Sequence, residues 1–335
     1  MNKIQNDDII IRKAILHILD SESGYIKISN NLLDLGEELN DFFRNHIFKI
    51  ISGDDAKHGV LSERNSPVLS LIEQMDEKDD DNFIEATKTL AENLFDIMCD
   101  SVTIPPADLI CVTFQLNSEI YFALLKMNYK ENYAHKEIDD NTQIFRVRAI
   151  QSGNAKITEA AVINLMNYSV LIKEKRYEML DGDKINYLSE RFLQCYADTD
   201  TKKKFNTMMK VVSDIYNHGR NVTEYFVAKE KLREEFEEKN EFRINEISDA
   251  LFGNGGNKKA AFDEKMELYD MQYDKFSVQS DSTIKKLDYY EIETDTGIQI
   301  KIPAEIYEFH NDVEIHEGYD GTTITIRNIE SMKAK

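Results

Sequence analysis

The amino-acid sequence predicts an α+β protein with an N-terminal antiparallel sheet and flanking helices, a central helical bundle and a C-terminal set of short antiparallel strands. Three patterns carry this prediction. Strand-like alternation dominates the first half, apolar residues recur every three or four positions in the middle, and short alternating runs separated by glycine return near the end. We therefore expect an α+β domain at 1–180, and a helical region followed by a small β-rich segment at 181–335.

The first half contains two predicted hairpins. Gly24 supplies the turn of the first, and Asn117–Ser118 is the short polar connection of the second. Strands are predicted at 14–20, 25–29, 107–116, 119–129, 143–150 and 160–167. Two amphipathic helices, at 34–51 and 82–100, complete this half. The acidic run 76–81 favours a helix start, because negative charge is stabilising at a helix N-terminus.

The second half changes from helical spacing to strand alternation. Helices are predicted at 184–197, 204–217, 223–240 and 244–252. A glycine-rich stretch, 252–259, is interpreted as a flexible connection that ends the bundle. Short strands are predicted at 288–294, 297–303, 312–316 and 322–329.

Composition narrows the class of protein. The 335 residues carry a formal net charge of −21, which excludes a histone-like protein that coats DNA by bulk positive charge. Three widely spaced cysteines indicate a reducing cytoplasm rather than disulfides or a zinc site. No secretory signal is recognisable, and no apolar stretch approaches the roughly 18 residues of a membrane helix. We expect a cytoplasmic protein without membrane association.

Motifs for catalysis are missing from the sequence. The seven histidines are scattered, and no nucleophile elbow is present. Gly253–Lys259 lacks the frame of a phosphate-binding loop, and Asp181–Lys184 is better explained as a turn than as a nuclease carboxylate–lysine pair. We expect no enzyme activity, no catalytic residues, no metal and no cofactor.

The basic residues are distributed unevenly. Between Glu37 and Asp100 acidic residues number 16 and basic residues 6, whereas between Lys156 and Arg220 the numbers are 9 and 11. This second stretch is the best candidate for meeting phosphate. The candidate DNA-binding residues are Lys173, Lys175, Arg176, Lys202, Lys203, Lys204, Lys210 and Arg220.

The lysines near 202 belong to a predicted amphipathic helix. At 100° per residue, Lys203 and Lys210 fall together, opposite a stripe that includes Phe205, Met208 and Val212. Lysines on such a face commonly serve only solubility. Four of them within nine residues nevertheless stand out in so acidic a chain, and this favours contact with DNA.

The order of several short segments along the chain resembles that of bacterial nucleoid-associated proteins of the NdpA/YejK type. The segments are AILHIL near the start, HGVLSE at 58–63, PADLICVTFQ, EIYFALLKMNY, INYLSERFLQCY, MKVVSDIYN, ISDALFG at 247–253, and GIQIKIPAEIY followed by TTITIRN. The resemblance implies a cytoplasmic, nucleoid-associated protein and carries over no catalytic residue. The acidic run 76–81 and the lysines 202–204 depart from the family pattern.

Together these observations predict a non-enzymatic, nucleoid-associated protein that binds double-stranded DNA with little sequence specificity. The alternative is an acidic protein-interaction module or DNA mimic, recruited to the nucleoid through a DNA-processing partner. A nuclease with a split active site is a distant third. The sequence leaves the oligomeric state open, and a homodimer is among the arrangements considered.

Overall fold

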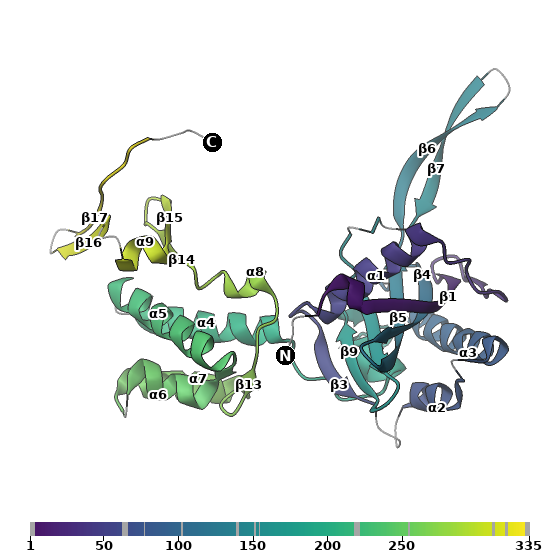
Figure 1. The fold of residues 1–335 in the computed structure, drawn as a ribbon, viewed down its shortest axis with the longest axis horizontal. Helices are drawn as coiled ribbons and strands as arrows, with labels where there is room; N and C mark the ends of the chain where they lie inside the picture. Colours follow the sequence, from purple (N-terminus) through teal and green to yellow (C-terminus); the bar gives the residue numbers. More distant parts are fainter. Residues whose placement is uncertain are drawn as a thin grey trace. The chain divides into compact units, whose positions relative to one another are not determined.

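The chain divides into two compact units, Met1–Asp200 and Thr201–Lys335. The computed structural model describes residues 4–61, 66–76, 78–101, 103–138, 141–150, 152–153, 155–217, 222–253, 255–309, 312–318 and 321–331. Figure 1 shows an antiparallel sheet with helices in the first unit, and helices followed by short strand pairs in the second. The predicted α+β fold class is confirmed.

The first unit is built on a seven-stranded sheet of order β2-β1-β4-β5-β8-β9-β3. All its neighbouring strands are antiparallel. The strands are β1 (Ile9–Asp20), β2 (Tyr25–Lys27), β3 (Lys57–Val60), β4 (Ala107–Leu116), β5 (Glu119–Asn128), β8 (Glu159–Asn164) and β9 (Ser169–Lys173). Both predicted hairpins are therefore present, as β1–β2 and β4–β5.

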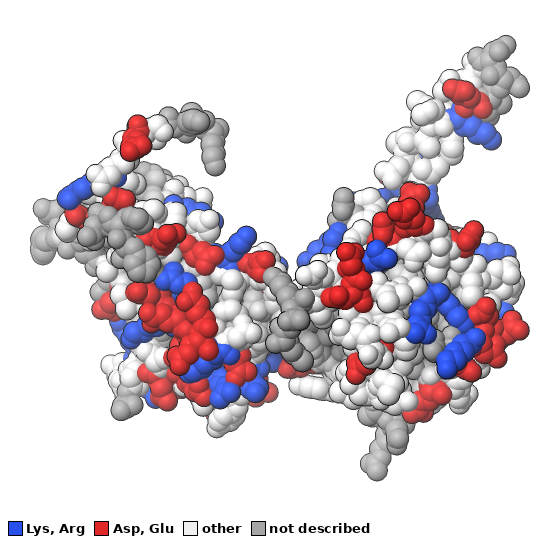
Figure 2. All heavy atoms as spheres, in the orientation of Figure 1, with Lys and Arg blue, Asp and Glu red and all other residues white. Residues whose placement is uncertain are grey.

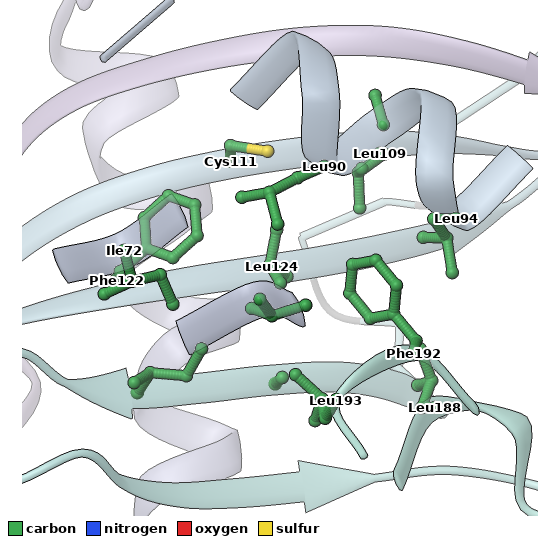
Figure 3. Packing of buried hydrophobic residues seen from close by; sticks show 14 of the residues in the cluster. Ile72, Leu90, Leu94, Leu109, Cys111, Phe122, Leu124, Leu188, Phe192 and Leu193 are labelled. Carbon is green, nitrogen blue, oxygen red and sulfur yellow. The ribbon is translucent and has the colours of Figure 1, made fainter. Parts of the chain in front are cut away.

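Helices cover both faces of this sheet. Along β4, Leu109 and Cys111 belong to one core, while Ile110 and Val112 belong to another. The second core includes buried residues of α1 (Glu37–Ile51). The first is closed by α2 (Pro67–Gln74) and α3 (Asp80–Cys99), and Figure 3 shows its packing. The alternation of strand side chains explains why the central strands are apolar throughout.

The acidic run before α3 acts as a helix start. The Asp79 carboxylate accepts hydrogen bonds from the backbone N–H groups of Asp81 and Asn82, at 3.0 and 3.2 Å. This is N-capping, which satisfies amides that have no partner within the helix.

Residues 181–200 depart from the sequence prediction. Instead of a helix at 184–197 that opens the second domain, they form β11 (Lys184–Ile185), paired with β10 (Tyr177–Glu178), and a short π-helix, Leu188–Phe192. Tyr187, Leu188, Phe192 and Leu193 are buried in the core beneath α3. The predicted helix at 184–197 is therefore wrong, and the segment belongs to the first unit.

A separate two-stranded ribbon rises from the first unit. It pairs β6 (Lys130–Ile138) with β7 (Asn141–Ala149), and Figure 1 shows it projecting beyond the sheet. We call it the β6–β7 arm. The sequence predicted only its second strand.

The second unit begins with helices packed around one core. These are α4 (Thr201–Asn217), α5 (Val222–Lys239), α6 (Ile244–Phe252) and α7 (Asn257–Leu268). The predicted bundle is present, but the glycine-rich stretch leads directly into α7, a helix that the sequence analysis missed. Gly256 has a φ of +118°, a conformation that L side chains rarely adopt, so glycine suits this break.

Short elements complete the second unit, and those after residue 288 form a smaller core centred on Phe226 and Tyr290. They are β12 (Phe242–Arg243), β13 (Lys275–Phe276), α8 (Asp281–Ile284), β14 (Tyr289–Glu293), β15 (Gln299–Pro303), α9 (Ala304–Phe309), β16 (Val313–Gly318) and β17 (Gly321–Ile326). The pairs β14–β15 and β16–β17 are the predicted C-terminal antiparallel strands.

Candidate nucleic-acid interface

Two of the lysines that the sequence suggested for DNA contact are buried. Lys173 lies at the end of β9 with its side chain 6% exposed, and its ammonium is 2.8 Å from the Asp55 carboxylate. Lys204, also 6% exposed, is 3.0 Å from the Asp274 carboxylate. Each neutralises a carboxylate of its own unit, so neither ammonium is placed to meet a phosphate.

The Asp55 site shows what Lys173 does instead. Asp55 is bound by two ammonium groups, those of Lys173 and Lys156, the latter at 2.6 Å. Burial acts to raise the pKa of Asp55, but hydrogen bonds and charge from the two lysines outweigh burial and hold it below its ordinary value. The carboxylate therefore stays ionised and stabilises the end of β9.

Three candidate lysines share one face of α4. Lys203 and Lys210 are exposed and Lys202 is half-buried. Lys203 and Lys210 lie opposite the buried residues Phe205 and Met208, and Lys202, in the first turn, lies at the edge of that face. Because seven residues make almost two full helical turns, Lys203 and Lys210 stand one above the other. We call Lys202, Lys203 and Lys210 the α4 lysine face.

Asn206 links the α4 lysine face to another part of the second unit. It is exposed on the same side of α4, and its side-chain oxygen accepts a hydrogen bond of 2.6 Å from the Lys286 ammonium. Lys285 and Lys286, both exposed, follow α8 directly. The sequence analysis missed this lysine pair, which lies about 80 residues away along the chain. The one sequence feature that marks it is the presence of two adjacent lysines. Lys258 and Lys259 are also adjacent, yet they are not part of this surface.

The remaining candidates lie elsewhere. Lys175 and Arg176 are exposed in the first unit, just after β9, and Arg176 donates a hydrogen bond of 2.7 Å to the Lys184 carbonyl. Arg220 lies outside the described residues. The structure thus brings together Lys202, Lys203 and Lys210 on one helix, whereas Lys173, Lys175 and Arg176 belong to the other unit.

Acidic side chains cover much of the rest of the surface. Figure 2 shows Asp and Glu in broad patches on this face of both units, with Lys and Arg in smaller groups. Many of these cations are already paired with carboxylates; Lys258 with Glu224, Lys259 with Asp249 and Lys265 with Asp214 are examples in the second unit. Repulsion from the acidic surface would confine a polyanion to the few places where cations predominate.

The β6–β7 arm is a different kind of surface. Its residues 130–149 include four basic and four acidic side chains, so the arm carries no net charge. Tyr133 and Ile144 are 79% and 75% exposed, and Figure 2 shows mostly uncharged residues along the arm. At its base, Arg148 is 2.7 Å from the Asp20 carboxylate, which fixes β7 to the end of β1.

The described residues contain no group of three or more His, Cys, Asp or Glu side chains that could hold a metal ion. Within the same part of the chain, no helix combines the length and the apolar character needed to cross a bilayer.

The fold and this surface define an acidic α+β protein in two units, with a small cationic helix face as its candidate site for a polyanion. The sequence model of the family of nucleoid-associated protein YejK matches residues 15–333, nearly the whole chain. The chain therefore belongs to this nucleoid-associated family, and the predicted resemblance is confirmed. No curated protein matches the chain.

Proposed function

We propose that the chain is a non-enzymatic protein that binds double-stranded DNA with little sequence preference, through the α4 lysine face. The observation that carries the proposal is the alignment of Lys202, Lys203 and Lys210 on one side of α4, with Lys286 beside them through Asn206. Lysine ammonium groups bind phosphates as point charges and read no base, so this face suits contact with the DNA backbone.

Charge reversal of the α4 lysine face tests the proposal. In the variant Lys202→Glu, Lys203→Glu, Lys210→Glu, duplex affinity in a gel-shift series should fall on the order of a hundredfold, at about 1 kcal/mol per lost phosphate contact. The loss should be equal for unrelated duplexes, because phosphates carry no sequence information.

A second triple variant controls for net charge. Lys258→Glu, Lys275→Glu, Arg327→Glu changes the charge by the same amount at exposed or partly exposed basic residues of the same unit that lie off the α4 lysine face. It should bind duplex within about threefold of the parent, a free-energy change below about 1 kcal/mol. Equal losses in both variants would mean that overall charge, and not this face, governs binding. Circular-dichroism melts of both variants exclude loss of fold.

The arm supports a second candidate function, an interaction module that reaches the nucleoid through a protein partner. A two-stranded ribbon is only marginally stable alone in water, and exposed Tyr133 and Ile144 are typical of a surface that a protein covers. The variant Tyr133→Ser, Ile144→Ser distinguishes the candidates in cells. Direct DNA binding predicts unchanged nucleoid association for this variant and loss for the α4 variant; recruitment by a partner predicts the reverse.

A homodimer stays a prediction for which light scattering is the measurement.

A further inference from the structure

A cavity of about 600 Å³ opens in the second unit, beside the α4 lysine face. Its walls come from α4, α5, the residues around α8, and the strands β14 and β15. It is lined by Asn206, Met209, Tyr225, Lys229, Ser282, Lys285, Lys286, Tyr289, Glu291 and Lys301. This volume falls within the range of about 300–1,000 Å³ that is typical of small-molecule sites.

Positive charge is concentrated in the lining. Four of the lining residues are lysines and a single one, Glu291, is acidic, in a chain whose net charge is −21. Lys301 is 3.0 Å from Glu291, so that carboxylate already balances one lysine. Like charges held around one concavity repel each other, and an anion placed among them removes that cost.

Lys229 gives the cavity a fixed cation at its wall. The residue is only 6% exposed, and its ammonium donates a hydrogen bond to the Tyr289 carbonyl and lies 5.7 Å from the centre of the Tyr290 ring. Burial lowers the pKa of Lys229 to about 8; the charge of Lys301 adds to this effect, and the carboxylates of Glu291 and Asp288 oppose it. A buried ammonium with one neutral acceptor gains more from an anion than an exposed lysine does, because water screens it less.

The cavity also has aromatic and apolar walls. Tyr225, Tyr289 and Met209 are half-buried around it, and the Lys301 ammonium lies 4.3 Å from the centre of the Tyr289 ring. A simple phosphate ion needs only the lysines. Aromatic faces next to lysines suit a ligand that joins a phosphate to a flat ring, since bases stack on aromatic side chains.

We propose that this cavity binds the phosphate group of a nucleotide, with Lys229, Lys285 and Lys301 as its cationic partners and the tyrosines beside its base. This site requires no duplex and so goes beyond DNA binding by the α4 lysine face. The phosphate could belong to a free nucleotide or to the backbone of bound DNA, and the two sources share the same chemistry at the lysines.

Calorimetric titration of the full chain tests the proposal. Adenosine monophosphate and inorganic phosphate should both bind, the nucleotide more tightly, and adenosine without phosphate should give no binding heat. Absence of binding by both phosphate-bearing probes at millimolar concentration overturns the proposal. Equal binding of adenosine and its monophosphate also overturns it, because the lysines would then contribute nothing.

Substitutions locate the site. The double variant Lys285→Gln, Lys301→Gln changes two exposed side chains and should weaken monophosphate binding at least about tenfold, the effect of losing a charge-assisted hydrogen bond. Lys229→Met, which keeps the buried stem, should do the same. Lys275→Gln, 66% exposed and outside the lining, is the matched control and should bind as the parent does. If Lys229→Met does not fold, the double variant Lys285→Gln, Lys301→Gln tests the site alone. Unchanged monophosphate binding by that double variant refutes the site.

Two comparisons separate this site from the proposed function. The α4 charge-reversal variant should lose duplex but keep monophosphate binding, whereas the double variant should lose the monophosphate first. Competition then assigns the phosphate source. If duplex displaces the monophosphate, the phosphate that the cavity binds belongs to the DNA backbone. If both bind at the same time, the cavity binds a free nucleotide. If the chain binds duplex but no phosphate probe, the cavity proposal fails while the proposed function stands.

Discussion

The sheet of the first unit and the helix α4 of the second unit place their lysines differently. In the first unit Lys57, Lys126 and Lys173 bind carboxylates at 2.7, 3.2 and 2.8 Å, and their partners are buried or partly buried. In the second unit Lys203 and Lys210 stand on the exposed side of a helix. Basic residues close together in a sequence can form a binding surface only where the fold turns them outward.

The centre of the first unit's polar network is Glu159, whose side chain is completely buried on β8. Its carboxylate accepts hydrogen bonds from Lys126, Asn128, Tyr177 and Tyr187, at 2.6 to 3.2 Å. Burial acts to raise its pKa, but Lys126 and the other donors outweigh burial and keep the pKa below its ordinary value. The network joins residues 177–187 to the sheet.

The largest expected effect comes from breaking this network. Glu159→Gln keeps the shape of the side chain but leaves the Lys126 ammonium buried without a counter-charge, which should cost about 3–5 kcal/mol of unfolding free energy. Urea denaturation followed by circular dichroism measures it. Glu178→Gln is the matched control: that carboxylate is 52% exposed and 3.8 Å from Lys184, so its loss should be small. A cost for Glu159→Gln below about 1 kcal/mol would contradict the role given to the network.

Acid should also destabilise the first unit selectively. Burial lowers the pKa of His17 and His46 to about 4, with small additional effects of Lys88 and Lys49. Their folded pKa lies below the unfolded value of 6.5, so the unfolded chain binds protons first and stability falls as pH drops from 6.5 towards 4. By pH 5 the loss should be about 2 kcal/mol for each histidine.

One carboxyl opposes this effect. Burial raises the pKa of Asp108 to about 6, so its protonation restores about 1 kcal/mol by pH 5, and the net effect remains a loss. Hydrogen exchange at pH 7 and pH 5 resolves the two units, and amides of β1 and α1 should lose protection before those of α4. His46→Gln should reduce the pH dependence, whereas His316→Gln, at an exposed histidine, should leave it unchanged. Equal loss of protection in both units would contradict the prediction.

Salt dependence provides a test of the second unit's role. If the three lysines of the α4 lysine face meet three phosphates, the slope of log K against log[salt] should be roughly −3. Affinity should then fall about 40-fold between 50 and 200 mM salt, as fluorescence anisotropy with labelled duplex can measure. A slope near zero would exclude phosphate contact, and a slope far steeper than −3 would mean that further cations take part.

The smallest effect is expected for the exposed cations of the first unit. Lys175→Glu, Arg176→Glu should change duplex affinity less than about threefold if the α4 lysine face makes the phosphate contacts, because these two residues belong to the other unit. The same anisotropy assay, run beside the α4 variant, compares the units directly. A loss as large as that of the α4 variant would place DNA contact on the first unit as well.

Much of the fold was predictable because its strongest elements have regular patterns. The hairpin β4–β5 agrees with its prediction within one residue, since an apolar run on either side of Asn117–Ser118 has one obvious pairing. The strand β6 was missed because its side chains are mostly exposed, which removes the alternation on which strand prediction depends. The helix α7 was missed because its surface-exposed residues show little apolar periodicity.

The candidate site was only partly predictable. Helical spacing correctly put Lys203 and Lys210 on one face, because periodicity fixes direction around a helix. It could not exclude Lys204, whose partner Asp274 lies 70 residues further on. It could not find Lys286 or Lys301 either, since their position beside α4 depends on tertiary packing. The local sequence pattern predicts which way a side chain points from its helix. Contacts between side chains of distant segments become known only from the fold.

The strand order of the first unit has a consequence for how the protein is made. The edge strand β3 pairs with β9, His58 opposite Leu171, and its other side is bound by the segment around Ala197 and Asp198. At about 5–20 residues per second, the ribosome needs on the order of 10 s to pass from His58 to Leu171. During that time β3 has neither partner, so the sheet can close only late in synthesis, when α4 is about to emerge. The last step, in which the segment around Ala197 closes over β3, requires glycine at position 59. A Cβ atom there would lie 2.7 Å from the Tyr196 carbonyl oxygen.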